Sequence, residues 1–245
     1  MKSKFVFFII ILPLIFIISS CKTTKSIAKV DVISNTFSGG TENVTIEFLK
    51  GPSFNHPTYV VWMEDNCGNY IRTLFITKSY ASGIFGRQMV GDTLWLKKSG
   101  QSYQPAALPY WTYKKGLING KSYVPTPDNQ FIDAYSGATS LNDFKFETSV
   151  TSIMSDYRIL VEVNQAWDWN QYWTNNKYPD NHAYKHSAQP SLIYEARINP
   201  EENEIYFNVI GHGDPKGETG KLYSNVKSVT SQIFKSIKIY RNLNK

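Results

Sequence analysis

Two apolar runs, Tyr59–Glu64 (YVVWME) and Tyr70–Ile76 (YIRTLFI), flank the polar cluster Asp65–Asn69 (DNCGN), and this stretch decides the fold. β-Branched and aromatic residues fill both runs, and such residues favour extended strands. The Asn and Gly residues between them are typical of a tight turn that joins paired strands. The stretch therefore predicts an antiparallel β-hairpin, the clearest one in the chain.

Further short runs of this kind occur on both sides of the hairpin. Gly, Pro, Asn or Asp bounds each run, and no long window shows a 3.6-residue apolar stripe. Helix is expected for one or two turns at most, around Gly83–Gln88. The pattern predicts an all-β, antiparallel sandwich with long loops, least regular over residues 95–145. The other expected strands are Val44–Leu49, Tyr157–Val163, the pair Ser191–Ile198 and Glu204–Ile210, and Ile233–Tyr240.

The chain begins with a targeting segment, assigned to residues 1–20. Two lysines precede Phe5–Ile18, an apolar run that only Pro13 interrupts and that is too short for a typical membrane-spanning helix. The run ends in Ile18-Ser19-Ser20-Cys21, which resembles the lipobox of bacterial lipoproteins. That resemblance implies cleavage before Cys21 and lipidation of Cys21, and the alternative is an uncleaved membrane anchor.

The lipobox implies a lipid-anchored protein of the bacterial cell envelope. Residue 22 is Lys rather than Asp, and no acidic cluster follows it, so we expect the protein to face the periplasm. Residues 21–43 are assigned to the lipidated cysteine and its tether, and residues 44–245 to a single β domain.

Charge and cysteine content exclude several classes of protein. The formal net charge is +6, and no Lys/Arg run marks a nucleic-acid groove. Cys67 is the only cysteine besides Cys21. Once Cys21 carries lipid, the chain can form no internal disulfide, four-cysteine zinc site or Cys-x-x-Cys-His haem attachment.

One run of small residues carries the strongest functional signal. Asp133–Ser140 (DAYSGATS) places an acid before slim residues that end in a hydroxyl. A weak nucleophile that must enter another enzyme's active site needs an exposed turn and neighbours of little bulk, and glycine permits such a turn. The alternative is that Gly137 is a turn glycine between two strands, with no role in any modification.

The run resembles the Asp-x-x-Ser/Thr-Gly-Ala-Thr acceptor motif of proteins that carry covalent FMN. In those proteins a flavin transferase joins FMN to the last Thr through a phosphoester. The resemblance implies that Thr139 accepts FMN and that Asp133 helps the transferase to recognise or activate it. It also implies that the residues between them, Ser136, Gly137 and Ala138, leave the hydroxyl accessible to the transferase.

Several stretches together resemble the DUF2271 family of bacterial periplasmic proteins, over roughly Val44–Tyr240. The family implies an immunoglobulin-like sandwich outside the cytoplasm and no settled activity. Leu141–Met154 departs from it, because it lacks the expected Trp-Asp-Gly-type turn. The matching stretches are Val61–Asp65, Gly68–Leu74, Asp133–Thr139, Tyr157–Glu162, Gln189–Tyr194 and Gly211–Gly213.

Three other groups of residues are weaker candidates. His182 and His186 are spaced to share a helical face and clamp a metal, but the prolines around them favour a loop. His212 follows an expected strand, either as a site residue or as a buried or turn histidine. The aromatic cluster Trp167–Trp173, which includes Asp168, either belongs to the core or stacks a ligand ring such as a sugar, isoalloxazine or quinone.

The sequence favours an envelope lipoprotein that carries FMN on Thr139 for electron transfer outside the cytoplasm. Its expected partners are the membrane, through the lipid anchor, a flavin transferase and a redox partner in the envelope. The alternative is a cofactor-free β-sandwich that binds a partner protein or glycan through its aromatic cluster. No serine nucleophile elbow or phosphate-binding glycine loop is present, so a stand-alone enzyme is not expected.

Lipidation predicts a specific effect of Cys21→Ala. Without the thiol no lipid can be attached, so the exported variant should remain unprocessed or become soluble, whereas the wild type should partition into detergent. Detergent phase separation followed by mass measurement distinguishes these states. A Cys21→Ala protein that still enters detergent with a mature-sized N-terminus would exclude the lipoprotein assignment.

Overall fold

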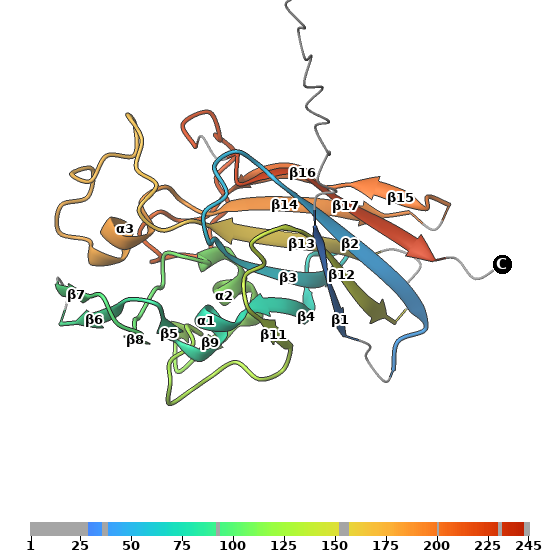
Figure 1. Cartoon of the computed structure of the whole chain (residues 1–245), viewed down its shortest axis with the longest axis horizontal. Helices are drawn as coiled ribbons and strands as arrows, with labels where there is room; N and C mark the ends of the chain where they lie inside the picture. The colour runs from blue at the N-terminus through green and yellow to red at the C-terminus, as the bar shows by residue number, and fades with distance from the viewer. Residues whose placement is uncertain are drawn as a thin grey trace, which may run out of the picture.

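The computed structural model describes residues 29–35, 39–91, 94–151, 157–199, 201–229 and 232–242. Within these ranges the chain is an all-β, sandwich-like protein with short helices (Figure 1). None of the helices in the described ranges is long and apolar enough to cross a membrane. The targeting segment and Cys21 lie outside the described residues.

The predicted hairpin is confirmed as β3 (Thr58–Asp65) and β4 (Tyr70–Thr77), which pair antiparallel. Gly68 adopts a φ of 83° in the connecting turn, a conformation that glycine takes without strain. Its amide donates to the carbonyl of Asp65 at 3.0 Å and closes the turn. The two strands lie within a six-stranded sheet of order β11-β4-β3-β13-β14-β16.

The remaining strands of this sheet come from the second half of the chain. β13 (Tyr157–Asn164) lies between β3 and β14 (Leu192–Ile198), antiparallel to both. The edges are β11 (Tyr135–Gly137), which is parallel to β4, and β16 (Asn208–His212), which is antiparallel to β14.

A second sheet has five strands in the order β1-β12-β2-β17-β15. β1 is parallel to β12, and the other pairs are antiparallel. The bounds are β1 (Val30–Asn35), β2 (Glu42–Lys50), β12 (Asp143–Val150), β15 (Glu204–Tyr206) and β17 (Phe234–Asn242).

Aromatic rings fill the space between the two sheets. Phe48 of β2 stacks on Phe144 with ring centroids 4.4 Å apart and reaches Tyr59 of the other sheet at 5.8 Å. Tyr59 in turn stacks on Phe75 at 5.2 Å. Burial of such large rings contributes most of the apolar area that stabilises a sandwich.

The other face of the six-stranded sheet is covered as well. α1 (Lys78–Ser82) and α2 (Pro109–Lys115) lie against it, on the side away from β2 and β17 (Figure 1). Trp62 and Leu160 belong to this second core, together with Trp111 of α2. Burial on both faces explains why β3 and β13 are apolar without strict alternation.

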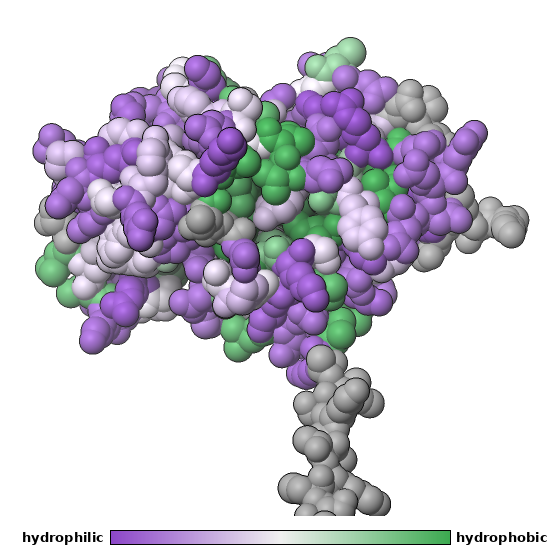
Figure 2. Space-filling model, turned by 90° about the horizontal axis from the view of Figure 1, so that it is seen from above, coloured by the Kyte–Doolittle hydropathy of each residue, from purple (hydrophilic) through white to green (hydrophobic). Residues whose placement is uncertain are grey.

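Side chains of the irregular region complete the cover, among them Leu108, Tyr123 and Phe131, which belong to the second core. The short strands of this part of the chain are β5 (Ile84–Phe85), β6 (Gln88–Val90), β7 (Leu94–Leu96), β8 (Gly100–Gln101), β9 (Leu117–Ile118) and β10 (Lys121–Ser122). The third helix is α3 (His182–Ser187), and the carbonyl of Ser187 accepts from Asn164 at the end of β13. Figure 2 shows another face, mostly hydrophilic, with apolar side chains gathered toward its middle.

The strand expected over Glu204–Ile210 is wrong as a single element, because the chain changes sheets at Phe207. β15 pairs with β17 in one sheet, and β16 pairs with β14 in the other. The Phe207 side chain is buried between the sheets, and its amide donates to the carbonyl of Ile237 at 3.0 Å. The continuous apolar run in the sequence therefore gives no sign that the chain crosses from one sheet to the other.

Three further expectations need correction. The sandwich is mixed rather than purely antiparallel, because β1–β12 and β11–β4 are parallel pairs. The tether assigned to residues 21–43 contains β1 and the first two residues of β2, because β1 pairs with β12 and forms the edge of the second sheet. The helical turn expected at Gly83–Gln88 lies earlier, at Lys78–Ser82, and Gly83 with φ 67° ends it.

Charged side chains on the second face are buried in pairs. Arg158 donates to both Glu64 and Glu195, at 2.5 Å and 2.7 Å. The Glu64 side chain has no exposed surface and also accepts from the indole of Trp62 at 2.9 Å. Removal of one partner of such a pair leaves an unpaired buried charge, which costs more than the pair contributes.

Glu162 on β13 is the second buried acid of this face. It accepts the first amides of α2, from Tyr110 at 3.1 Å and from Trp111 at 2.7 Å, and the hydroxyl of Ser191 at 2.6 Å. Complete burial raises the pKa of Glu162 to about 7, although these three donors oppose the rise. The carboxyl group therefore fixes α2 on the sheet and makes the free energy of unfolding depend on pH.

The raised pKa predicts how stability changes between pH 4 and pH 8. Below about pH 4.5 Glu162 is protonated in both states, whereas between about 4.5 and 7 only the unfolded chain loses the proton. The unfolding free energy should therefore fall as pH rises through this window, by roughly 3 kcal/mol from this group. Urea unfolding across the window should show a smaller fall for Glu162→Gln. The exposed control Glu201→Gln should keep the wild-type profile, and identical profiles for all three proteins would contradict the assignment.

Candidate functional site

The acceptor run forms an edge strand rather than the turn expected from the sequence. Ser136 is opposite Ile76 and Gly137 is opposite Thr77 in the parallel pair β11–β4. Gly137 has no positive φ, and a Cβ there would lie 3.0 Å from the rings of Phe75 and Tyr135. Glycine is therefore needed because β11 packs closely on an aromatic ring, and both earlier assignments of Gly137 to a turn are wrong.

Thr139 lies two residues beyond the end of β11 and is half-buried. Its hydroxyl donates to the carbonyl of Pro57 at 3.1 Å. Ala138 beside it is exposed. The next residue, Ser140, is buried and donates to Asp31 at 2.8 Å, which anchors the loop to β1. The hydroxyl oxygen of Thr139 is thus held at the surface with one slim exposed neighbour.

The other residues of the motif lie along the same strand. Ser136 and Asp133 are both exposed. Asp133 precedes β11 by two residues, and its charge acts on Tyr70 and Tyr123, raising the pKa of both phenols in addition to the larger effect of burial. The length of β11 therefore separates Asp133 from Thr139, so the structure does not bring the acid to the hydroxyl.

The aromatic cluster divides into two groups. Trp167 and Trp169 are partly exposed, and Trp167 packs against Trp95 and His186 with ring centroids 5.7 Å and 5.3 Å apart. Trp167 has a φ of 68°, an uncommon conformation for a large side chain. Tyr172 is exposed at a different part of the surface, whereas Trp173 is buried and belongs to the main core. The cluster is therefore neither one core nor one exposed platform.

The two histidines expected in a loop are on a helix, α3, because Asn181 caps it by accepting the amide of Tyr184 at 2.7 Å. His182 is exposed, whereas His186 is buried against Trp95 with ring centroids 4.2 Å apart. Burial lowers the pKa of His186 to about 4. Among the described residues no group of three His, Cys, Asp or Glu side chains could hold a metal ion.

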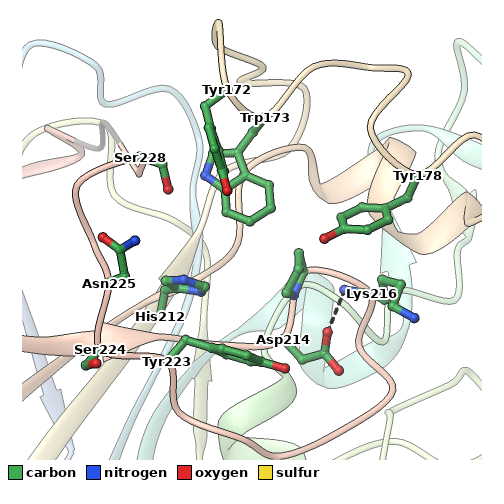
Figure 3. Close-up of a pocket in the computed structure, with 11 residues that line it drawn as sticks. Tyr172, Trp173, Tyr178, His212, Asp214, Lys216, Tyr223, Ser224, Asn225 and Ser228 are labelled. Atoms are coloured by element: carbon green, nitrogen blue, oxygen red, sulfur yellow. Dashed lines mark hydrogen bonds between the residues drawn. The ribbon is translucent and has the colours of Figure 1, made fainter.

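A cleft of about 360 Å³ lies beyond the end of β16 (Figure 3). Tyr172 and Trp173 form one wall, and Tyr223 stacks beneath His212 with ring centroids 5.2 Å apart and planes 10° apart. Trp173 meets His212 edge to face at 5.8 Å. The remaining lining residues are Tyr178, Asp214, Pro215, Lys216, Ser224, Asn225 and Ser228.

His212 is held in one tautomer in this cleft. Its Nδ1 lies 2.8 Å from the carbonyl of Gly213, and a carbonyl can only accept, so Nδ1 carries the proton. Burial lowers the pKa of His212, against opposing effects of Gly213 and Asp214, and thereby favours the neutral ring. Its Nε2 is therefore a hydrogen-bond acceptor.

Asp214 is oriented by two donors from its own loop. One carboxylate oxygen accepts the amide of Lys216 at 3.0 Å (dashed in Figure 3), and the other accepts the hydroxyl of Thr219 at 2.8 Å. Each oxygen retains a further lone pair for a ligand. The cleft thus combines aromatic surfaces with fixed acceptors. The sequence singled out His212, but it carried no signal for Tyr178 or Tyr223.

A second cleft of about 360 Å³ adjoins the first, and Lys216 lines both. Tyr103, Tyr113 and His182 are among its other lining residues. Thr139 lines neither cleft. β11 and β16 are the opposite edges of one sheet, separated by five strand spacings or about 24 Å, so the acceptor segment and the cleft beyond β16 are separate sites.

No family model matches the chain, and no curated protein or solved structure shows significant similarity to it.

The close packing of β11 predicts that Gly137→Val destabilises the protein. The new side chain would collide with Phe75, and overpacking of this kind costs about 1–3 kcal/mol of unfolding free energy. Ser136→Val on the same strand places a similar side chain on the exposed face and should change stability by less than about 0.5 kcal/mol. Equal urea midpoints for the two variants would show that β11 does not pack on β4 as described.

Proposed function

We propose that the protein is a lipid-anchored carrier of FMN in the bacterial cell envelope, with the flavin joined covalently to Thr139 for electron transfer. The observation that carries the proposal is the placement of the acceptor run on an open sheet edge. Ser136 and Ala138 are exposed, and the hydroxyl of Thr139 lies just beyond the strand. Bound FMN would supply the redox chemistry, while the protein would supply its position and electrostatic surroundings.

The residues around Thr139 fit attachment at the surface. The hydroxyl makes one hydrogen bond, to Pro57, and an ester oxygen could no longer donate it, so attachment would cost about 1 kcal/mol. Lys50 donates to the carbonyl of Leu141 and places a cation beside the loop. A phosphodiester at Thr139 carries one negative charge, which this ammonium group would partly offset.

The transfer itself balances without an oxidant or reductant. The oxygen of Thr139 forms a bond to the phosphorus of the FMN half of a flavin dinucleotide held by the transferase. The bond from that phosphorus to the bridging oxygen breaks, and a nucleoside monophosphate leaves. The hydroxyl proton passes to a base on the transferase. Asp133, separated from Thr139 by β11, serves recognition by the transferase in this scheme.

The resemblance to the DUF2271 family, the immunoglobulin-like form of the sandwich and the periplasm-facing lipid anchor belong to the same proposal. Two packed sheets with a strand that crosses between them support the immunoglobulin-like assignment. The parallel pairs at β1 and β11 are additions to that form. The alternative function, a cofactor-free module that binds a partner protein or glycan, is favoured by the aromatic cleft next to β16.

Flavin attachment is tested by co-expression with a periplasmic flavin transferase. The wild type should gain the mass of one FMN and give a fluorescent band on a denaturing gel, because a phosphoester survives unfolding. Thr139→Ala should gain nothing, since it has no hydroxyl at the reacting position. Thr139→Ser restores the hydroxyl and should regain the label, and Ser136→Ala should reduce labelling only weakly.

The binding-module alternative predicts a different set of masses. The wild type would remain unlabelled and Thr139→Ala would be indistinguishable from it, although the same transferase labels a control substrate. Equal labelling of wild type and Thr139→Ala would place the flavin on another residue.

A further inference from the structure

The cleft beyond β16 has its own chemistry, independent of Thr139. Its acceptors are held rigidly: the carbonyl of Gly213 fixes the His212 tautomer, and Thr219 with the Lys216 amide orients Asp214. Its volume of about 360 Å³ lies at the small end of the range of roughly 300–1,000 Å³ for ligand pockets. Such a volume suits a ligand of one or two rings.

The arrangement of the aromatic rings shows which kind of ring could enter. The ring planes of Trp173 and His212 are 77° apart, and those of Tyr172 and Trp173 are 81° apart. Neighbouring rings of the lining are therefore nearly perpendicular and form corners. His212 and Tyr223 are parallel, but they already stack on each other and leave no slot between them. A flat flavin or quinone prefers a parallel pair of rings, whereas a puckered ring fits a corner with one face against an aromatic side chain.

The polar groups of the cleft match hydroxyl groups. Asp214 and the Nε2 of His212 accept hydrogen bonds, and the Asn225 amide with the hydroxyls of Ser224 and Ser228 can both donate and accept (Figure 3). A sugar ring presents alternating hydroxyls at its edge and C–H groups on its face, which suit this combination. The charged residues of the lining are Asp214 and Lys216. The Lys216 ammonium pairs with Glu218 at 2.6 Å, so Asp214 is left to repel an acidic substituent placed beside it.

From these contacts we propose that the cleft is a binding site for a neutral saccharide. The sugar face lies against the face of Tyr172 opposite Lys177, whose Nζ lies 3.3 Å from the ring centroid and covers the other face, and the sugar hydroxyls donate to Asp214 and His212. A longer saccharide extends past Lys216 into the adjoining cleft. The site and Thr139 lie beyond opposite edge strands of one sheet, which are about 24 Å apart, so a carrier of FMN could bind glycan without contact between the two groups.

A glycan array tests the proposal with the folded protein made without any transferase. Fluorescently labelled protein is applied to an array of neutral and acidic oligosaccharides, and affinities for the brightest neutral glycan are then measured by the change in tryptophan fluorescence. Tyr172→Ala should weaken binding about tenfold through the loss of stacking, and Asp214→Asn by a similar factor. Tyr206→Ala is the matched control, because Tyr206 is a similarly exposed tyrosine on β15 of the other sheet.

The possible results distinguish a loss of glycan binding from a loss of the fold. Tyr172 is 56% exposed, so its removal should leave the fold intact, and an unchanged melting temperature verifies this. Absence of any neutral glycan signal, binding of acidic glycans alone, or equal weakening by Tyr206→Ala would overturn the proposal. Thr139→Ala should bind glycan as the wild type does, so a failure here leaves flavin attachment untouched, and a failure of flavin attachment leaves this site standing.

Discussion

Burial of the six-stranded sheet on both faces is the constraint on which the rest of the structure depends. One face of β3 and β13 meets the second sheet, and the other meets α1, α2 and the segment that follows them. Acids on this second face cannot reach water, so each needs a donor. Glu64 pairs with Arg158 and with Lys114 of α2, and the first amides of α2 donate to Glu162. The same contacts that satisfy these charges therefore hold the helical cover on the sheet.

This constraint leaves the edges of the sheet for function. β11 and β16 are edge strands, and the two candidate sites follow directly from their C-terminal ends. Loops beyond strand ends can carry exposed polar groups without disturbing a buried core. The proposed flavin attachment and the proposed saccharide site thus occupy opposite edges of one rigid scaffold, and each can be altered without loss of the other.

The sequence predicts elements whose pattern is local. The hairpin β3–β4 was predicted correctly because its turn lies between two apolar runs, and β2, β13 and β17 were predicted from similar runs. The crossing at Phe207 was missed because a strand that changes sheets keeps the composition of a single strand. The parallel partner of β1 lies more than a hundred residues away, beyond any local signal.

Residue types at the candidate sites were easier to predict than their surroundings. The motif marked Thr139, but the need for Gly137 arises from the ring of Phe75, which lies on another strand. His182 and His186 were expected in a loop because prolines flank them, whereas the Asn181 cap starts a helix there. The cleft brings together Trp173, His212 and Tyr223 from separate segments, so its lining could not be read from spacing.

The most direct test of the account is the intact mass of the protein purified from the membranes of its own cells, followed by fragmentation of the peptide that contains Thr139. We expect a lipidated chain that begins at Cys21 and carries the mass of one FMN on Thr139. A lipidated chain with an unmodified Thr139, from cells that attach flavin to other proteins, would contradict it.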